Sequence, residues 1–93
     1  MLSLDSWKPV VGWPEYEISN LGVVRRNGKL LRQFIVKGYL SFNVHSNHKR
    51  ASLRVHREVL RAHDPTDNKL LLVRHLDGDP FNCRLSNLAW GTQ

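Results

Sequence analysis

The chain has 93 residues, 41% of them hydrophobic and 24% charged, with one cysteine and a net charge of +6. This length allows one domain with a thin core or two small modules that share one, and a single cysteine excludes both an internal disulfide and a zinc knuckle built from several thiolates. No apolar run approaches the roughly 20 residues of a membrane span, and the N-terminus lacks the basic start and apolar core of a signal peptide, so we expect a cytoplasmic protein.

The positive charge is concentrated in the middle of the chain. Between Val23 and Arg61 there are ten basic residues and one acidic residue, a net charge of +9, whereas the remainder has four basic and seven acidic residues, a net charge of −3. A basic middle segment in so small a protein is typical of a polyphosphate partner such as DNA or RNA. A solvated basic surface is the alternative that charge alone leaves open.

Short strands joined by tight turns are predicted for the N-terminal third. Residues 7–14 are expected to be ordered but irregular, with Trp7 and Trp13 as core anchors. Asn27 and Gly28 both tolerate positive φ and predict a type I′ hairpin. Strands are predicted at residues 16–19, 23–26 and 30–36.

The clearest pattern is an alternation of apolar and polar side chains in residues 40–45 and 51–56, with a turn at residues 46–49 between them. One face of this two-stranded ribbon is therefore apolar, and the other is polar and basic. Since a ribbon of this kind fits the major groove, Asn43, His45 and Arg54 are candidates for base contacts. Phosphate contacts are expected from the basic side chains Arg25, Arg26, Lys29, Arg50, Arg54, Arg57 and Arg74.

Helical spacing replaces the alternation at Val55 and predicts a helix over residues 55–63, which Asp64 and Pro65 end. His56, where strand meets helix, is expected to make a structural hydrogen bond.

A buried strand is predicted at residues 70–73, followed by Arg74 and His75. Residues 77–80 predict a tight turn, and residues 87–92 predict a last strand with Trp90 in the core. Cys83 is expected to be a small filler near the bend, because no His or acidic spacing around it suggests a reactive thiolate.

The C-terminal stretch resembles the HNH nucleases of phages and self-splicing introns. Their pattern is a histidine at a strand end, an Asp-Gly turn, an Asn-rich bend and then Asn-Leu-x-Trp, which residues 73–92 match with His75, Asp77-Gly78, Asn82 and Asn87-Leu88-Ala89-Trp90. Residues 12–22 are similar to the modular DNA-binding motif that often precedes such nucleases, and Val55-His56-Arg57 resembles their connecting element.

The resemblance covers nearly the whole chain and implies an α+β fold in two parts. Residues 1–54 would be a small antiparallel DNA-binding β-module. Residues 55–93 would hold a short helix and an HNH motif of the ββα-metal type that lacks its last helix.

The resemblance also implies roles for individual residues. His75 would be the general base that activates water, and an imidazole that titrates near neutral pH suits that task. Asn87 would pin the loop and orient His75, with Asn82 as a second candidate. One divalent metal, Mg²⁺ or Mn²⁺, would bridge the scissile phosphate and the leaving oxygen.

Two departures from the family pattern leave the metal ligands incomplete. Arg74 stands just before His75, where a ligand is usual, and the sequence ends at Gln93, before the helix that carries another. Three explanations stay open: a fragment of a longer nuclease, a module that binds DNA without cutting it, or a metal held by Asp77 or Asp79 with a partner chain completing the site. The first is favoured over the second, and a carboxylate in an Asp-Gly turn more often serves the turn itself.

We therefore expect metal-dependent nicking or cleavage of double-stranded DNA. A catalytically silent DNA-binding module and an RNA- or intron-binding protein are the alternatives. Arg74, next to His75 in sequence, is expected to bind the phosphate near the cut.

Overall fold

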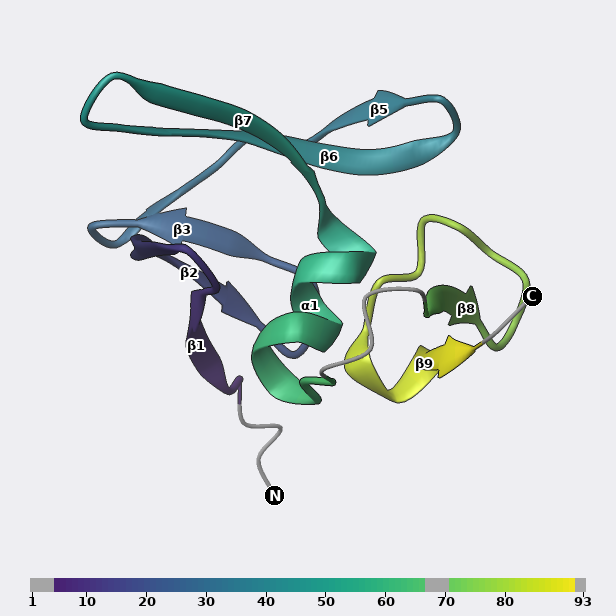
Figure 1. The fold of residues 1–93 in the computed structure, drawn as a ribbon. Helices are drawn as coiled ribbons and strands as arrows, with labels where there is room; N and C mark the ends of the chain where they lie inside the picture. Colours follow the sequence, from purple (N-terminus) through teal and green to yellow (C-terminus); the bar gives the residue numbers. More distant parts are fainter. Residues whose placement is uncertain (1–4, 67–70, 92–93) are drawn as a thin grey trace.

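The computed structural model describes residues 5–66 and 71–91, and it has an α+β fold of antiparallel strands around one helix (Figure 1). Within these residues the strands form three sheets, ordered β1-β2-β3-β4, β5-β6-β7 and β8-β9. The elements are β1 (Trp7–Val10), β2 (Trp13–Ser19), β3 (Val24–Arg26), β4 (Lys29–Leu30), β5 (Phe34–Val36), β6 (Tyr39–Ser46), β7 (Lys49–Arg54), α1 (Val55–His63), β8 (Leu72–His75), the 3₁₀ turn η1 (Leu85–Asn87) and β9 (Leu88–Gly91). The predicted α+β class, with a β-module before a short helix and a ββ pair after it, is confirmed.

The first sheet begins with a strand that the sequence did not predict. The irregular stretch expected at residues 7–14 is instead β1 and the start of β2, paired from Trp7↔Ser19 to Val10↔Trp13. Pro9 lacks an N–H, and it is tolerated because β1 is an edge strand. Trp13 packs against the core as expected, whereas the prediction for Trp7 is wrong, because its ring lies outside the core under the Arg25 guanidinium at 3.8 Å.

The hairpin at Asn27 and Gly28 is confirmed, with φ angles of 51° and 79°. The single strand predicted at residues 30–36 is wrong, because the segment divides between two sheets. β4 pairs with β3 and β5 pairs with β6. Between them the chain crosses from one sheet to the next, held by the Gln33 side chain, which donates to the carbonyl oxygen of Gly22 at 2.7 Å.

Strands β6 and β7 form the predicted ribbon, in register from Ser41↔Arg54 to Ser46↔Lys49. Their turn places Asn47 and His48 at positive φ, 48° and 70°. The apolar side buries Phe42 and Val44. On the opposite side Ser41 is also buried, whereas Asn43, His45, Arg50 and Ser52 are exposed.

Helix α1 matches the predicted range and follows β7 without an intervening residue. Its apolar side buries Val55, Val59 and Leu60. Figure 1 shows α1 in the middle of the molecule, and the helix contacts strands of all three sheets. One core therefore unites the two halves of the chain; its buried members are Val10, Tyr16, Ile18, Val24, Phe42, Val44, Val55, Val59, Leu60, Cys83 and Leu88.

The ββ pair after the helix is less buried than predicted. Leu72 is 42% exposed and Val73 is half-buried, because among the described residues β8 pairs only with β9, in a two-stranded sheet. Trp90 packs against the core, and its Nε1 donates to the carbonyl oxygen of Asp64 at 2.6 Å. Residue 70 of the predicted strand and residue 92 of the predicted last strand lie outside the described residues. No helix in the described ranges is long and apolar enough to cross a membrane.

Candidate active site and basic surface

His75 is the last residue of β8, and its backbone is fixed on both sides. It pairs with Leu88 of β9. The next amide, of Leu76, donates to the carbonyl oxygen of Asn87 at 2.8 Å, and the Gly78 amide donates to the carbonyl oxygen of His75 at 3.0 Å. The candidate base therefore sits at a strand end whose position β9 and the following turn define.

Asn87 is the centre of the loop that follows His75. Its buried side chain accepts from the Asp77 amide at 3.0 Å and donates to Asp77 Oδ1 at 2.9 Å and to the carbonyl oxygen of Asn82 at 3.0 Å. Asn82 Nδ2 donates to Asp77 Oδ2 at 2.8 Å. The structure thus brings His75, Asn87 and Asn82 together in one strand-and-loop unit.

Both candidate metal ligands are engaged within this loop. Asp77 Oδ1 also accepts from the Asp79 amide at 2.8 Å, and Asp79 Oδ1 accepts from the Phe81 amide at 2.9 Å. Hydrogen bonds from Asn82, from the Asp79 amide and from Asn87 hold the pKa of the Asp77 carboxyl below its ordinary value. Among the described residues no three His, Cys, Asp or Glu side chains cluster as a metal site would require. These residues alone do not fit a complete metal site.

The His75 imidazole lies in a three-ring stack in which each ring contacts the other two, so that the three centroids form a triangle, and the His56 and His75 planes are inclined by 42°. The His75 centroid is 5.0 Å from that of His56, and the Tyr39 and His56 centroids are also 5.0 Å apart with planes inclined by 25°. Tyr39 and His75 lie 6.2 Å apart. Such distances are typical of favourable aromatic contact. Nε2 of His75 is buried without a hydrogen-bond partner.

His56 was expected to make a structural hydrogen bond, and in the structure its ring lies in the stack. Its side chain is 7% exposed, and Nδ1 is buried without a hydrogen-bond partner. Burial, followed by the charges of His75, Arg57 and Arg54, lowers its pKa from 6.5 to about 4. The ring is therefore neutral at neutral pH.

Arg54 and Arg57 lie at the ribbon-to-helix junction beside the stack. Arg54 donates to the carbonyl oxygen of Val36 at 2.8 Å and sits over the Tyr39 ring at 5.3 Å. Arg57 sits over the Trp90 ring at 5.9 Å. The positive charge of the ribbon thus continues to the strand end that carries His75.

Arg74 points away from His75, because successive residues of a strand project from opposite faces. Its aliphatic stem crosses Gly91, where a Cβ atom would come within 2.5 Å of Arg74 Cδ. The side chain is exposed.

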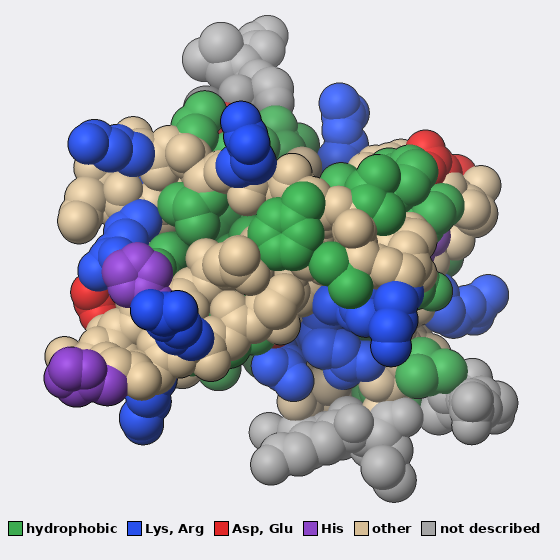
Figure 2. All heavy atoms as spheres, turned by 90° about the horizontal axis from the view of Figure 1, so that it is seen from above, with side chains coloured by type: hydrophobic (Ala, Val, Ile, Leu, Met, Phe, Trp, Pro, Cys, Tyr) green, Lys and Arg blue, Asp and Glu red, His purple; other side chains and the backbone are tan. Residues whose placement is uncertain are grey.

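The other basic side chains predicted to contact phosphates differ in whether they form ion pairs within the protein. Arg25 forms an ion pair with Glu17 at 2.9 Å, and Arg26 forms one with Glu15 at 3.0 Å. Lys29, at the β3–β4 turn, is exposed. Figure 2 looks down on the β5-β6-β7 sheet and shows Lys and Arg side chains spread over this face, with acidic side chains only near its edges.

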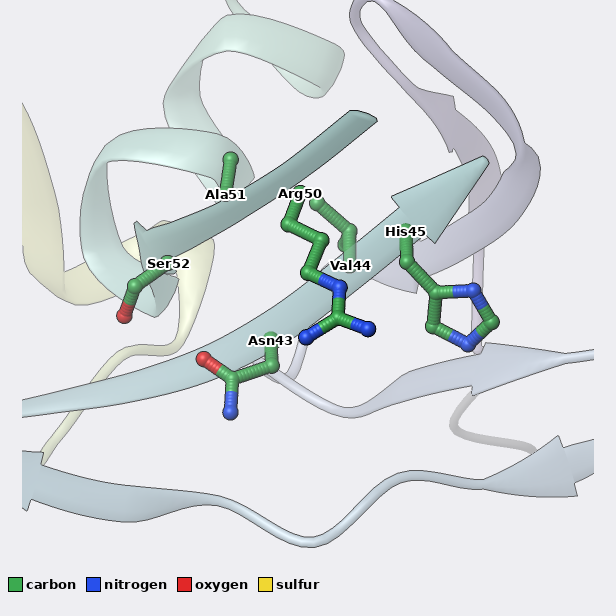
Figure 3. Close-up of a pocket in the computed structure, with 6 residues that line it drawn as sticks. All are labelled: Asn43, Val44, His45, Arg50, Ala51 and Ser52. Carbon is green, nitrogen blue, oxygen red and sulfur yellow. The ribbon is translucent and has the colours of Figure 1, made fainter. Parts of the chain in front are cut away.

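The outer face of the ribbon forms a shallow hollow. Asn43 and His45 on β6 and Arg50 and Ser52 on β7 project on this side, paired as Asn43↔Ser52 and His45↔Arg50. Figure 3 shows the Asn43, Arg50 and His45 side chains close together over it. With Val44 and Ala51 they line a space of about 530 Å³. The two predicted base-reading residues on β6 thus share one exposed face with Arg50.

The turn at Asn20 to Gly22 was predicted from the sequence, but sequence reasoning missed the role of Tyr39 and the contact of this turn with the segment around Cys83 and Leu85. The Leu85 amide donates to the carbonyl oxygen of Asn20 at 2.7 Å, and a Cβ at Gly22 would lie 3.1 Å from Cys83 Cβ. Cys83 is buried as expected, and burial, with the charge of Asp79, raises its pKa to about 11. No local sequence pattern indicates the contact between these distant segments. Gly22 does, however, lie in the stretch of residues 12–22 that resembles the modular DNA-binding motif.

The described residues thus form an α+β arrangement in which a histidine at a strand end and an Asn-held loop lie beside a basic ribbon. Residues 5–45 match the NUMOD4 motif. A solved structure described as DNA binding and cleavage by the HNH homing endonuclease I-HmuI superposes with a TM-score of 0.85 at 34% identity, over 95% of this chain and 53% of that one.

Sequence relatives agree with the structural match. The DNA endonuclease I-HmuI of Bacillus phage SP01 is 34% identical over 94% of this chain and 52% of its own length. The uncharacterized HNH endonuclease L245 of Acanthamoeba polyphaga mimivirus is 37% identical over 94% of this chain and 27% of its own length. The chain thus spans between about a quarter and a half of these relatives, and over that length it is similar to HNH homing endonucleases.

Proposed function

We propose that this chain binds double-stranded DNA and supplies the HNH site of an endonuclease that nicks or cleaves it by phosphodiester hydrolysis. The observation that carries the proposal is the placement of His75 at the end of β8, with Asn87 fixing the loop behind it. The basic ribbon on the same molecule and the similarity to I-HmuI support double-stranded DNA as the partner.

In the proposed reaction His75 is the general base. A water oxygen attacks phosphorus, its proton passes to the imidazole, and the bond to the leaving oxygen on the opposite side breaks. Because Nε2 is buried, Nδ1 is the nitrogen assigned to this proton. Asn87 and Asn82 act by holding the loop rather than by touching the reacting atoms.

A divalent ion, Mg²⁺ or Mn²⁺, would neutralise charge on the leaving oxygen. Asp77 or Asp79 would have to give up loop hydrogen bonds to bind it. We therefore assign these carboxylates to the loop. We infer that a complete ligand set needs residues from outside the described ranges or from a partner chain.

Residues 1–54 are proposed as the DNA-binding module and residues 55–93 as the nuclease motif, acting in the cytoplasm of a host cell. The ribbon would enter the major groove, with Asn43 and His45 toward base edges. The phosphate contacts would come from Arg25, Arg26, Lys29, Arg50, Arg54, Arg57 and Arg74, which set the register of the protein on DNA.

A DNA-binding module without catalysis is the second candidate. The observations that favour it are the arginine at position 74, which cannot ligate a metal, and the engagement of Asp77 and Asp79 within the loop. In this alternative the ribbon binds DNA as described above, and the strand-and-loop unit that contains His75 has only a structural role.

Incubation of supercoiled plasmid with the chain and Mg²⁺ or Mn²⁺ distinguishes the endonuclease from the non-catalytic binding module. We expect relaxed or linear product that His75→Ala abolishes. His63→Gln is the matched control, because it changes a histidine whose partner is the Ile18 carbonyl oxygen and keeps a donor there. A gel shift without product at any metal concentration would refute the enzyme and leave the binding module. Stronger binding of RNA than of duplex DNA would refute both.

A further inference from the structure

The His75 backbone is fixed, but its side chain still needs an orientation. A general base works only within hydrogen-bond reach of its water, and a small misplacement reduces the rate. Catalytic histidines are commonly oriented by a hydrogen bond to the nitrogen that does not react. Here Nε2 of His75 has no such partner.

We propose that His56 and Tyr39 are positioning residues for His75, orienting its imidazole by ring stacking where other sites use a hydrogen bond. The proposal rests on the proposed role of His75 as general base. Both rings contact His75, with centroids 5.0 Å away for His56 and 6.2 Å away for Tyr39, and the planes are inclined to that of His75 by 42° and 21°.

The His56 ring is itself held in place by the fold. His56 is in the first turn of α1, which follows β7 directly, and its side chain is 7% exposed. Its neutral ring packs against His75 without charge repulsion. Tyr39, the first residue of β6, packs against both His56 and His75.

Tyr39 is in turn covered by Arg54, which the Val36 carbonyl holds. The contacts of Arg54 with Tyr39, and of Tyr39 with both histidines, therefore connect the end of the ribbon to the end of β8. Three segments distant in sequence converge on one imidazole.

The first test needs no catalysis. In ¹⁵N-labelled protein, the His75 ring resonances are followed by long-range ¹H–¹⁵N correlation in His56→Ala, Tyr39→Ala, His56→Phe and Tyr39→Phe. We expect the Ala variants to move the His75 Cε1–H resonance toward its value in the unfolded chain. The Phe variants keep a ring in place and should leave it much nearer the wild-type position. Phe81→Ala, which removes an exposed ring from the same motif, should leave it unchanged.

The second test is the nicking rate. The Ala variants should lower kcat by about 10- to 100-fold with little change in KM, as expected for a misplaced base. The Phe variants should recover most of that loss. If His56→Phe is as slow as His56→Ala, a nitrogen of His56 is needed, and positioning by stacking is wrong.

The two tests separate this proposal from the proposed function. An unchanged His75 resonance in both Ala variants would overturn the positioning role, whether or not the chain cuts DNA. Absence of nicking in the wild type together with displaced resonances would leave the stack in place and refute the enzyme. Urea unfolding of each variant identifies any that fail to fold. Where an Ala variant does not fold, the Phe variant at the same position decides the outcome.

Discussion

The backbone amide of Leu85 donates to the carbonyl oxygen of Asn20 at 2.7 Å, across 65 residues of sequence. This bond joins the turn that ends β2 to the loop that holds Asn87. Next to it Gly22 approaches Cys83 so closely that a Cβ would meet both the side chain and the carbonyl oxygen at 3.1 Å. The N-terminal β-module and the strand-and-loop unit are thus packed as one body.

Gly22→Ala is expected to destabilise the protein more than Gly12→Ala. Both glycines have φ of +84°, so both substitutions add similar backbone strain, of order 1–2 kcal/mol. Only Gly22 also has a close neighbour, and overpacking there should add about 1–3 kcal/mol. Urea unfolding of the two variants measures the difference directly. Equal losses would show that the contact with Cys83 is not tight in solution.

Acid should weaken the loop through Asp77. Its folded pKa is depressed below the ordinary value of 3.8, so its contribution to stability is complete above that value and is lost as pH falls through the folded pKa. Asp77→Asn should therefore flatten the loss of stability below about pH 4. Urea midpoints measured from pH 5 downward test this. An unchanged slope in the variant would mean that another carboxyl is responsible.

Protonation of His56 should cause a second loss of stability, at a higher pH than the loss that comes from Asp77. Its folded pKa is lowered from 6.5 to about 4, so the unfolded chain binds the proton first, and stability falls as pH decreases through that interval. His56→Phe should remove part of this loss between pH 7 and pH 4. His48→Asn, in the exposed turn at φ 70°, is the control and should keep the wild-type pH dependence. The same loss in both variants would contradict the lowered pKa.

Binding to duplex DNA should depend on salt through the ribbon. Each neutralised phosphate contributes about −0.9 to the slope of log K against log salt, so Arg50→Ala should reduce the magnitude of the slope by roughly 1. Arg84→Ala changes an exposed arginine of the acidic remainder of the chain and should leave the slope unchanged. Fluorescence anisotropy across a salt series provides the measurement. A slope insensitive to Arg50 would remove the ribbon face from the interface.

The features that were predictable from sequence are those that local patterns determine. The change from period-two alternation to helical spacing placed α1 at its observed bounds, and residues such as Asn27 with Gly28 specified a turn by their φ preference. The motif spacing brought His75, Asn82 and Asn87 into one unit, as the hydrogen bonds show.

The features that were missed depend on contacts between distant segments. The division of residues 30–36 follows from pairing with two different sheets and from the Gln33 bond to Gly22, neither of which has a local pattern. The exposure of Leu72 follows from the absence of a second neighbour for β8 within the described residues. Tyr39 and His56 meet His75 only through the tertiary fold.

The junction at Arg54 and Val55 has a mechanical consequence. The last residue of a strand is followed there by the first residue of a helix, with nothing between them to act as a hinge. Any change in the angle between the hairpin and the helix axis must therefore be absorbed by the backbone torsions of these two residues, since no loop is present to bend in their place.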